Sequence, residues 1–225
     1  MKNILLLNGS VRKNSTSQSM IDYMQEQMKT KGQEISTIAL IDVFDEKISM
    51  EELLSKVEQA ETIGIIACCY INTLAYTTIE CLERLAKVGK EELKGKNLFA
   101  IGHGGMPYLD VHESCILVCQ CFAEQMQMNW LGSAIRGLTP LINGKKLEKD
   151  VFLAKGIMKG LDFLLEDIEN NRSISSKVQK SFNIYIPKVI NHPLVALLNY
   201  VGDKDRKASG ITNFDRKAYK ENGLL

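Results

Sequence analysis

The sequence lacks long apolar runs, an excess of charge of either sign, and more than a few prolines. No stretch approaches the roughly 18 apolar residues of a membrane span, so we expect no membrane partner. Lys and Arg number 28 against 27 Asp and Glu, a net charge of +1. This balance argues against a strongly basic nucleic-acid binder and against a highly acidic carrier protein. The four prolines exclude a proline-rich linker.

Signal-peptide features are also missing. The first ten residues, MKNILLLNGS, contain a short apolar run but no small-residue cleavage site. We therefore expect a cytoplasmic protein whose thiols are reduced. The six cysteines then belong to a metal site, to redox chemistry or to the core.

The sequence alternates regularly between two kinds of segment. Short apolar runs predict strands, and segments with an apolar residue every three or four positions predict helices. The predicted strands are Asn3–Asn8, Ile35–Ile41, Thr62–Tyr70, Leu98–Gly102 and Trp130–Ile135. The predicted helices are Ser17–Gly32, Met50–Ala60, Ile79–Ala86, Glu113–Met126 and Leu147–Ile168. This alternation predicts an α/β protein with helices on both faces of a parallel sheet. Five such strands favour a flavodoxin-like three-layer sandwich with strand order 2-1-3-4-5.

The predicted sheet domain covers residues 1–172, and residues 173–225 form a C-terminal helical or extended arm. Within the arm, Ile184–Val189 is typical of a short extended piece interrupted by Pro187, and Pro193 opens a helix through Tyr200. The basic segment Asp203–Lys220 is predicted to lie on the surface. It is either a solvated tail or an arm that docks on a partner subunit.

The first predicted strand ends in a loop suited to phosphate. Residues 8–17 supply a glycine, two cations and four hydroxyl side chains just before a helix: Gly9, Arg12, Lys13, Ser10, Ser15, Thr16 and Ser17. Hydroxyls, a cation and free amides at a helix N-terminus are what a phosphate group requires. The loop is neither a Walker loop nor a dinucleotide fingerprint. The plainer alternative is a polar loop with a Ser or Thr helix cap.

The pattern L-x-G-S-x-R-x-x-S-x-S in this loop resembles the phosphate loop of NADPH-dependent FMN reductases, a flavodoxin-fold family. The resemblance implies that residues 1–172 bind FMN. It assigns the FMN phosphate to Ser10, Arg12, Ser15, Thr16 and Ser17. Val11 stands where some members of the family have Pro, and Ser15 where some have Gly.

Two further loops are expected at the same edge of the sheet. The segment from Cys68 to Leu85 resembles the family's second flavin segment, with Tyr70 and Glu83-Arg84-Leu85 in register. The resemblance places the flavin ring along Cys69, Tyr70, Ile71, Asn72, Thr73 and Leu74. The third loop follows the predicted strand Leu98–Gly102, and its Gly104 and Gly105 permit close backbone approach to a ligand. His103 is either a contact of the flavin carbonyl region or a polar loop residue.

The cysteine spacing does not favour a metal site. Cys115 and Cys119 share a helix face with His112, but the C-x2-C spacing of zinc and iron–sulfur sites is missing. Burial among apolar neighbours is the simpler interpretation, for these residues and for Cys68 and Cys69. A redox thiol beside the flavin is the alternative.

The resemblance implies an oxidoreductase that takes hydride from NAD(P)H and reduces a quinone, flavin, azo or nitro compound, or metal ion. It implies a homodimer or homotetramer and assigns no catalytic side chain, since the hydride chemistry belongs to the cofactor. The alternatives are a non-enzymatic electron carrier of the flavodoxin type and a flavin-free binding module on the same fold.

Overall fold

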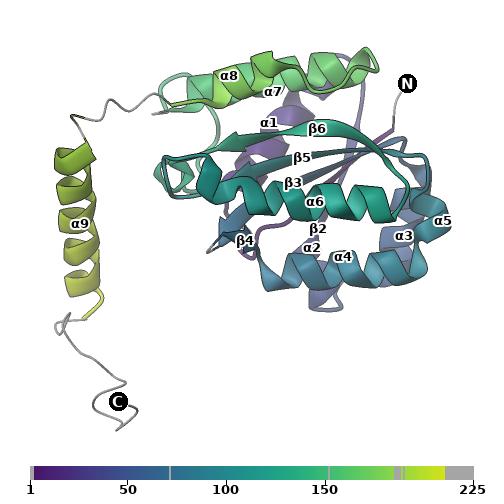
Figure 1. Ribbon diagram of the computed structural model, residues 1–225, viewed down its shortest axis with the longest axis horizontal. Coiled ribbons are helices and arrows are strands. Elements are labelled where there is room, and N and C mark those ends of the chain that lie inside the picture. The colour runs from purple at the N-terminus through teal and green to yellow at the C-terminus, as the bar shows by residue number, and fades with distance from the viewer. Residues whose placement is uncertain (1–2, 71, 152, 185–188, 190, 211–225) are drawn as a thin grey trace, which may run out of the picture. The chain divides into compact units, whose positions relative to one another are not determined.

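The computed structural model describes residues 3–70, 72–151, 153–184, 189 and 191–210. In this part of the chain the apolar runs form a central parallel sheet (Figure 1). Its main strands are β1 (Ile4–Asn8), β2 (Ile35–Ala39), β3 (Thr62–Tyr70), β5 (Asn97–His103) and β6 (Asn129–Arg136). They lie in the order β2-β1-β3-β5-β6. Counted along the chain without the short β4, this is the predicted order 2-1-3-4-5, and the flavodoxin-like fold is confirmed.

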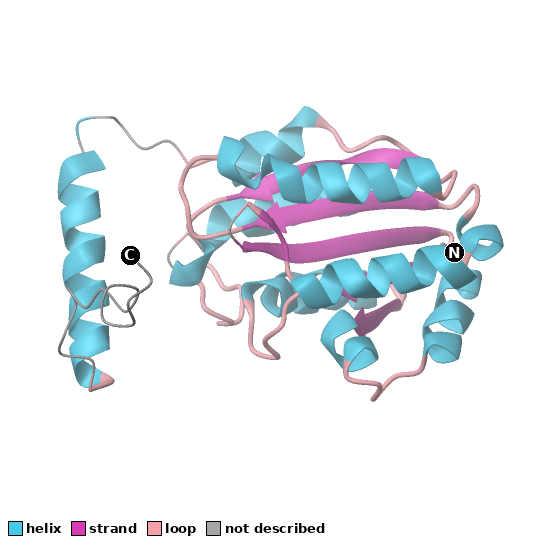
Figure 2. Cartoon of the chain, turned by 60° about the horizontal axis from the view of Figure 1, so that its bottom comes forward, coloured by secondary structure: helices cyan, strands magenta, loops and turns pink. Residues whose placement is uncertain are grey.

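Alternate side chains of each central strand pack into two hydrophobic layers, one on each face of the sheet. This explains why the apolar runs are unbroken. Leu5 and Leu7 pack into one layer, and Ile4 and Leu6 into the other. The first layer is covered by α2 (Leu40–Phe44), α3 (Met50–Gln59), α4 (Tyr76–Val88), α5 (Lys90–Leu93) and α6 (Glu113–Gln125). The second is covered by α1 (Thr16–Thr30), α7 (Ala154–Glu169) and α8 (Ser176–Phe182). Figure 2 shows the sheet between these helices.

Helix α7 begins later than the sequence predicts. Apolar spacing placed its start at Leu147, but the helix starts at Ala154. The prediction is wrong because Leu147 lies in a loop. Its side chain is buried there, and its position in the sequence happens to match the helical spacing of apolar residues. Leu153 has a φ of 65°, a left-handed conformation that prevents the helix from extending further toward the N-terminus.

The compact unit of the sheet reaches Ile184, further than the sequence-based boundary at 172. Arg136 gives a physical reason, since its buried guanidinium binds two carbonyl oxygens of segments beyond β6. Nη1 donates to the Phe182 carbonyl at 2.5 Å and Nη2 to the Leu153 carbonyl at 3.0 Å. Burial lowers the pKa of Arg136 to about 10, so it remains charged at neutral pH. These bonds and the burial of Val178 and Phe182 hold α8 against the sheet unit.

A second unit spans Tyr185–Leu225 and contains α9 (Asn191–Ala208). The predicted helix from Pro193 to Tyr200 lies within α9 and is confirmed. The expected extended piece at Ile184–Val189 falls mostly outside the described residues, as does the part of the basic segment after Gly210. None of the helices in the described ranges is both long and apolar enough to cross a membrane.

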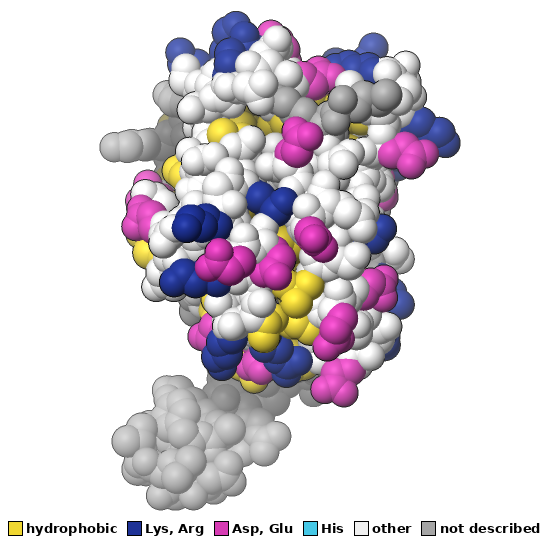
Figure 3. Space-filling view, turned by 90° about the vertical axis from the view of Figure 1, so that its right-hand side faces the viewer, with side chains coloured by type: hydrophobic (Ala, Val, Ile, Leu, Met, Phe, Trp, Pro, Cys, Tyr) yellow, Lys and Arg dark blue, Asp and Glu magenta, His cyan; other side chains and the backbone are white. Residues whose placement is uncertain are grey.

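Charges of both signs are interspersed on the surface near α3 and α5. Figure 3 shows this face with Lys and Arg side chains lying among Asp and Glu side chains. The mixture agrees with the net charge of +1.

Candidate functional site

The loops that follow β1, β3 and β5 meet at the carboxyl edge of the sheet. The Ser17 hydroxyl, at the start of α1, lies 2.7 Å from Nε2 of His103, the last residue of β5. The Thr78 hydroxyl of α4 donates to the Gly9 carbonyl at 2.9 Å. This edge is where doubly wound sheets bind their ligands. The loops that carry the predicted site residues are therefore together, although Ile71 itself lies outside the described residues.

Side-chain hydrogen bonds to the backbone shape the loop after β1. Asn8 Oδ1 accepts from the Ser10 amide at 2.9 Å, and Ser10 Oγ accepts from the Arg12 amide at 3.2 Å. Ser15 caps α1, because its Oγ accepts from the Gln18 amide at 3.2 Å. The chain therefore enters α1 with the first amides of the helix free of intrahelical partners, and such amides bind anions.

Two of the predicted phosphate contacts turn their hydroxyls into the protein. Thr16 Oγ1 donates to the Thr139 carbonyl at 3.0 Å, and the Ser17 side chain is fully buried against His103. For these two residues the backbone amides are the groups that remain for a ligand. Arg12 is exposed, with Nη1 3.3 Å from Asn143 Oδ1, and supplies positive charge to the loop together with the exposed Lys13.

His103 is a buried, neutral imidazole that joins two loops. Its side chain is 2% exposed, and Nδ1 lies 3.0 Å from the Thr139 hydroxyl. Because Thr139 Oγ1 donates to the Gly104 carbonyl at 3.1 Å, Nδ1–H donates to Thr139 and Nε2 accepts from Ser17. Burial is the main cause that lowers the pKa of His103 to about 3, helped by His112 and Arg12. Both ring nitrogens are thus engaged within the protein.

The loop after β3 is a tight hairpin. Its two strands are the end of β3 and the short β4 (Thr73–Leu74), with Tyr70 opposite Thr73 and Cys69 opposite Leu74. Asn72 lies in the turn with a φ of 63°, a left-handed conformation that asparagine tolerates well. Its carbonyl accepts a hydrogen bond from the Ser114 hydroxyl of α6. The sequence predicted this segment as a loop, and the hairpin gives it a defined shape.

Tyr70 connects the hairpin to the phosphate loop. Its phenol lies close enough to Cys68, Ser10 and Arg12 for these three residues to affect its pKa. Burial is the largest cause that raises the pKa of the Tyr70 phenol, and the Ser10 hydrogen bond acts in the opposite direction. Burial likewise raises the pKa of the Cys68 thiol. Both groups are therefore protonated at neutral pH.

The two glycines of the third loop differ in what surrounds them. A Cβ on Gly104 would lie 2.4 Å from Cε1 of the buried His112, whose Nε2 donates to the Met106 carbonyl. A Cβ on Gly105 would lie 3.5 Å from Pro140, an ordinary contact. Gly104 is therefore required by the packing of a side chain, whereas Gly105 is exposed and has room for a side chain.

Sequence reasoning missed Thr139 and Asn143. Thr139 lies in the short 3-10 helix η2 (Thr139–Leu141) beyond β6 and binds Thr16, His103 and Gly104. Asn143 accepts a hydrogen bond from Arg12. Neither residue belongs to a motif, so only the three-dimensional contact identifies them.

The cysteines and His112 do not assemble a metal site in the described residues. No cluster there holds three or more His, Cys, Asp or Glu side chains placed for a metal ion. Cys115 and Cys119 are buried in the core, and Cys121 is exposed. His112 lies at the end of the 3-10 helix η1 (Asp110–His112), against Gly104.

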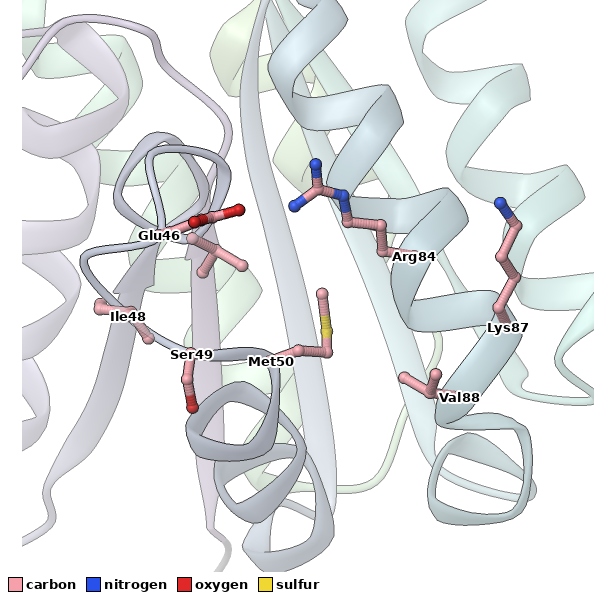
Figure 4. A pocket seen from close by; sticks show the side chains of 8 residues that line it. Glu46, Ile48, Ser49, Met50, Arg84, Lys87 and Val88 are labelled. Atoms are coloured by element: carbon pink, nitrogen blue, oxygen red, sulfur yellow. The ribbon is translucent and has the colours of Figure 1, made fainter.

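A cavity of about 480 Å³ lies apart from the three loops (Figure 4). It opens between α4 and the segment that joins α2 to α3, with Arg84 and Glu46 extending toward each other across it. Its lining consists of Val43, Glu46, Ile48, Ser49, Met50, Arg84, Lys87 and Val88. It contains none of the predicted site residues.

Comparisons with known proteins agree with this geometry. Similar solved structures include an apo NADH:FMN oxidoreductase, which is 15% identical with a TM-score of 0.57, where the match covers 80% of this chain and 94% of that chain. Another is a flavone reductase, 13% identical with a TM-score of 0.53, covering 99% of this chain and 96% of that chain. At such identities these likenesses show the fold alone. No curated protein matches the sequence.

The family comparison is more specific than the structural one. The family model of NADPH-dependent FMN reductases matches residues 2–131, which is more than half of the chain and includes all three loops. The chain therefore belongs to the NADPH-dependent FMN reductase family.

Proposed function

We propose that the protein is an FMN-dependent oxidoreductase that accepts hydride from NAD(P)H and reduces a small acceptor, such as a quinone, flavin, azo or nitro compound, or metal ion. The observation that carries the proposal is the family match over residues 2–131, a range that contains the three converging loops. No acid–base pair is needed for this activity, because the redox chemistry belongs to the cofactor.

The donor set after β1 fits the phosphate of FMN. We assign the phosphate to the N-terminus of α1, where Thr16 and Ser17 supply the first two backbone amides, which an α-helix leaves without intrahelical acceptors. The hydroxyls of Ser10 and Ser15 border this position, and Arg12 supplies a positive charge. A phosphate that carries close to two negative charges gains from both the helix N-terminus and the cation.

The flavin ring is assigned to the hairpin after β3. The backbone from Cys69 to Leu74 would follow the ring, with Asn72 and Thr73 near its pyrimidine edge, and Gly104 and Gly105 on the other side. When bound, FMN would supply the hydride-accepting chemistry. We assign His103 to positioning α1 through Ser17; a direct contact between His103 and the flavin carbonyl region stays a prediction.

Exposed apolar side chains around the loops would form a binding surface for a planar molecule that stacks on the flavin ring. Large side chains that are at least 38% exposed come from the loop after β1, the end of β3 and the loop after β5: Val11, Tyr70, Met106 and Tyr108. Such side chains gathered at one edge mark a binding surface for apolar or aromatic molecules. We propose that they receive the nicotinamide ring and then the acceptor.

A visible absorption spectrum of the purified protein tests the proposal. Bound FMN gives a yellow protein, and NAD(P)H added anaerobically should bleach the flavin band, with colour returning on addition of a quinone. Slow bleaching by NAD(P)H but rapid bleaching by dithionite would instead support an electron carrier. A colourless protein that does not bind added FMN would support a flavin-free module. Light scattering on the same sample tests the proposed homodimer or homotetramer.

A further inference from the structure

Two cysteines far apart in the sequence lie near each other beside the hairpin. Cys69 is half-buried, and its thiol donates to the Val111 carbonyl just before α6 at 3.7 Å. Cys115 lies four residues after Val111, in the first turn of α6, and is fully buried in the hydrophobic cluster against which Cys69 packs. The Cys69 thiol therefore lies at the helix turn that carries Cys115, and both residues are free thiols.

The other cysteines are placed differently. Cys68 precedes Cys69 in a strand, so its side chain points to the opposite face, where the Tyr70 phenol affects the pKa of its thiol. Cys119 is one turn further along α6 and is 1% exposed. Cys121 is exposed on the outer side of α6. Cys69 and Cys115 therefore combine a buried thiol at the start of α6 with a neighbouring thiol that solvent reaches.

We propose that Cys69 and Cys115 form a dithiol site that a hydroperoxide oxidises to an intramolecular disulfide. The Cys69 thiolate attacks hydrogen peroxide, which breaks the O–O bond, releases hydroxide and leaves Cys69 as a sulfenic acid. The Cys115 sulfur then attacks the Cys69 sulfur, forming the S–S bond and releasing water. The two thiols lose two electrons and two protons in total, and the peroxide is reduced to water.

The surroundings of the two thiols assign their roles. Cys69 is reached by solvent and so meets the oxidant first. Burial, with a smaller contribution from the Cys69 hydrogen bond, raises the pKa of the Cys115 thiol. A buried protonated thiol is a poor nucleophile toward dissolved peroxide but is well placed to resolve a sulfenic acid on the neighbouring Cys69.

The disulfide would fasten the hairpin to α6. Cys69 is paired with Leu74 in the hairpin, and Cys115 is fixed in the core, so the new bond would hold the segment that follows β3. The site needs only protein groups and a hydroperoxide. It therefore goes beyond the proposed FMN chemistry and is independent of it.

The test is peptide mapping of the reduced full-length protein after exposure to hydrogen peroxide, with free thiols blocked before digestion and no reductant added. We expect a linked pair of peptides containing Cys69 and Cys115, and an intact mass lower by two hydrogen atoms. The same linkage is expected with and without added FMN, so a failure of flavin binding leaves this result unaffected. Absence of that linkage, or a disulfide from Cys69 to Cys68 or Cys119, would overturn the proposal.

Variants separate the two steps. In Cys115→Ser the sulfenic acid of Cys69 should persist and be trapped by dimedone, whereas Cys69→Ser should lose both the adduct and the disulfide. Cys121→Ser is the matched control and should form the disulfide like the unchanged protein. Because Cys115 is fully buried, Cys115→Ala is measured alongside, with circular dichroism to verify folding. Equal dimedone labelling of Cys69 in the unchanged protein and in both Cys115 variants would contradict the resolving role.

Discussion

The Ser17 hydroxyl lies 2.7 Å from Nε2 of His103, although 86 residues separate them along the chain. This contact joins the N-terminus of α1 to the end of β5, so it fixes the first amides of α1 relative to the third loop. Ser17, which the sequence predicts as a phosphate contact, thus positions the N-terminus of α1 from inside the protein.

Ser17→Ala should lower the free energy of unfolding by about 1–3 kcal/mol, because it leaves the buried Nε2 of His103 without a donor. Urea unfolding followed by circular dichroism measures the change. Ser55→Ala is the control: Ser55 is exposed on α3 and bonds only an exposed Gln59, so a change within about 0.5 kcal/mol is expected. Equal effects of the two substitutions would show that the Ser17–His103 bond does not contribute to stability.

The low pKa of His103, about 3 in the folded protein against 6.5 as its ordinary value, predicts a pH dependence of stability. Below pH 6.5 the unfolded chain binds a proton at His103 that the folded protein does not, so stability is full above this pH and falls as the pH drops toward 3. The loss approaches about 1.4 kcal/mol per pH unit. Urea unfolding between pH 7.5 and 5.5 measures it, before most carboxylates titrate.

Two histidine variants test whether His103 causes this dependence of the unfolding free energy on pH. His103→Gln removes the titrating group and should flatten the dependence of the unfolding free energy on pH, whatever it does to absolute stability. His192→Gln changes an exposed histidine of α9 and should leave the slope as it is. A slope that survives in His103→Gln would assign the pH dependence to other groups.

Gly104→Ala and Gly105→Ala form a matched pair in the third loop. The added methyl at 104 would overlap the His112 ring, which is buried and bonded to the Met106 carbonyl, so we expect a loss of about 1–3 kcal/mol in unfolding free energy. At 105 the methyl meets only Pro140 at 3.5 Å, and stability should be nearly unchanged. Thermal unfolding of both variants measures the difference, and equal melting temperatures would contradict the packing role of Gly104.

The sequence predicts those parts of the fold in which buried apolar residues recur at a regular spacing. Residues 4–7 feed two hydrophobic layers in alternation, so a continuous apolar run there already indicates a central parallel strand. By contrast, β4 has two residues and no periodicity to detect. Leu147 shows the opposite failure, since a buried loop residue fell by chance at a helical spacing.

The site divides in the same way. The composition of residues 8–17 predicts a phosphate loop, because hydroxyls, cations and free amides at a helix N-terminus are the groups that bind phosphate. It does not say that Thr16 and Ser17 turn inward, since that depends on Thr139 and His103, which reach α1 only through the register of β5 and β6. Composition indicates the chemistry of a loop, and tertiary contacts decide which atoms remain for the ligand.

The second unit is expected to contribute to assembly. Three apolar side chains of α9, Val195, Leu197 and Tyr200, are each more than half exposed, and such a helix gains stability by burying them on a neighbouring subunit. Deleting residues 191–225, which removes these three side chains and the basic segment, should lower the oligomer mass measured by light scattering. Deleting only 221–225 is the control. An unchanged mass in the longer deletion would refute the docking of the arm on a neighbour.

Arg12→Ala should weaken FMN binding by about 1–3 kcal/mol, the range for a charge-assisted hydrogen bond. This corresponds to a roughly 5- to 150-fold higher dissociation constant, measured by flavin fluorescence quenching. Lys94→Ala removes the same charge from an exposed position after α5 and controls for net charge. Because the Arg12 side chain is exposed and bonds Asn143 at 3.3 Å, while its amide bond to Ser10 is kept in the alanine variant, the substitution should leave unfolding unaffected. Equal FMN affinity in Arg12→Ala and Lys94→Ala would therefore contradict the phosphate assignment rather than report a damaged fold.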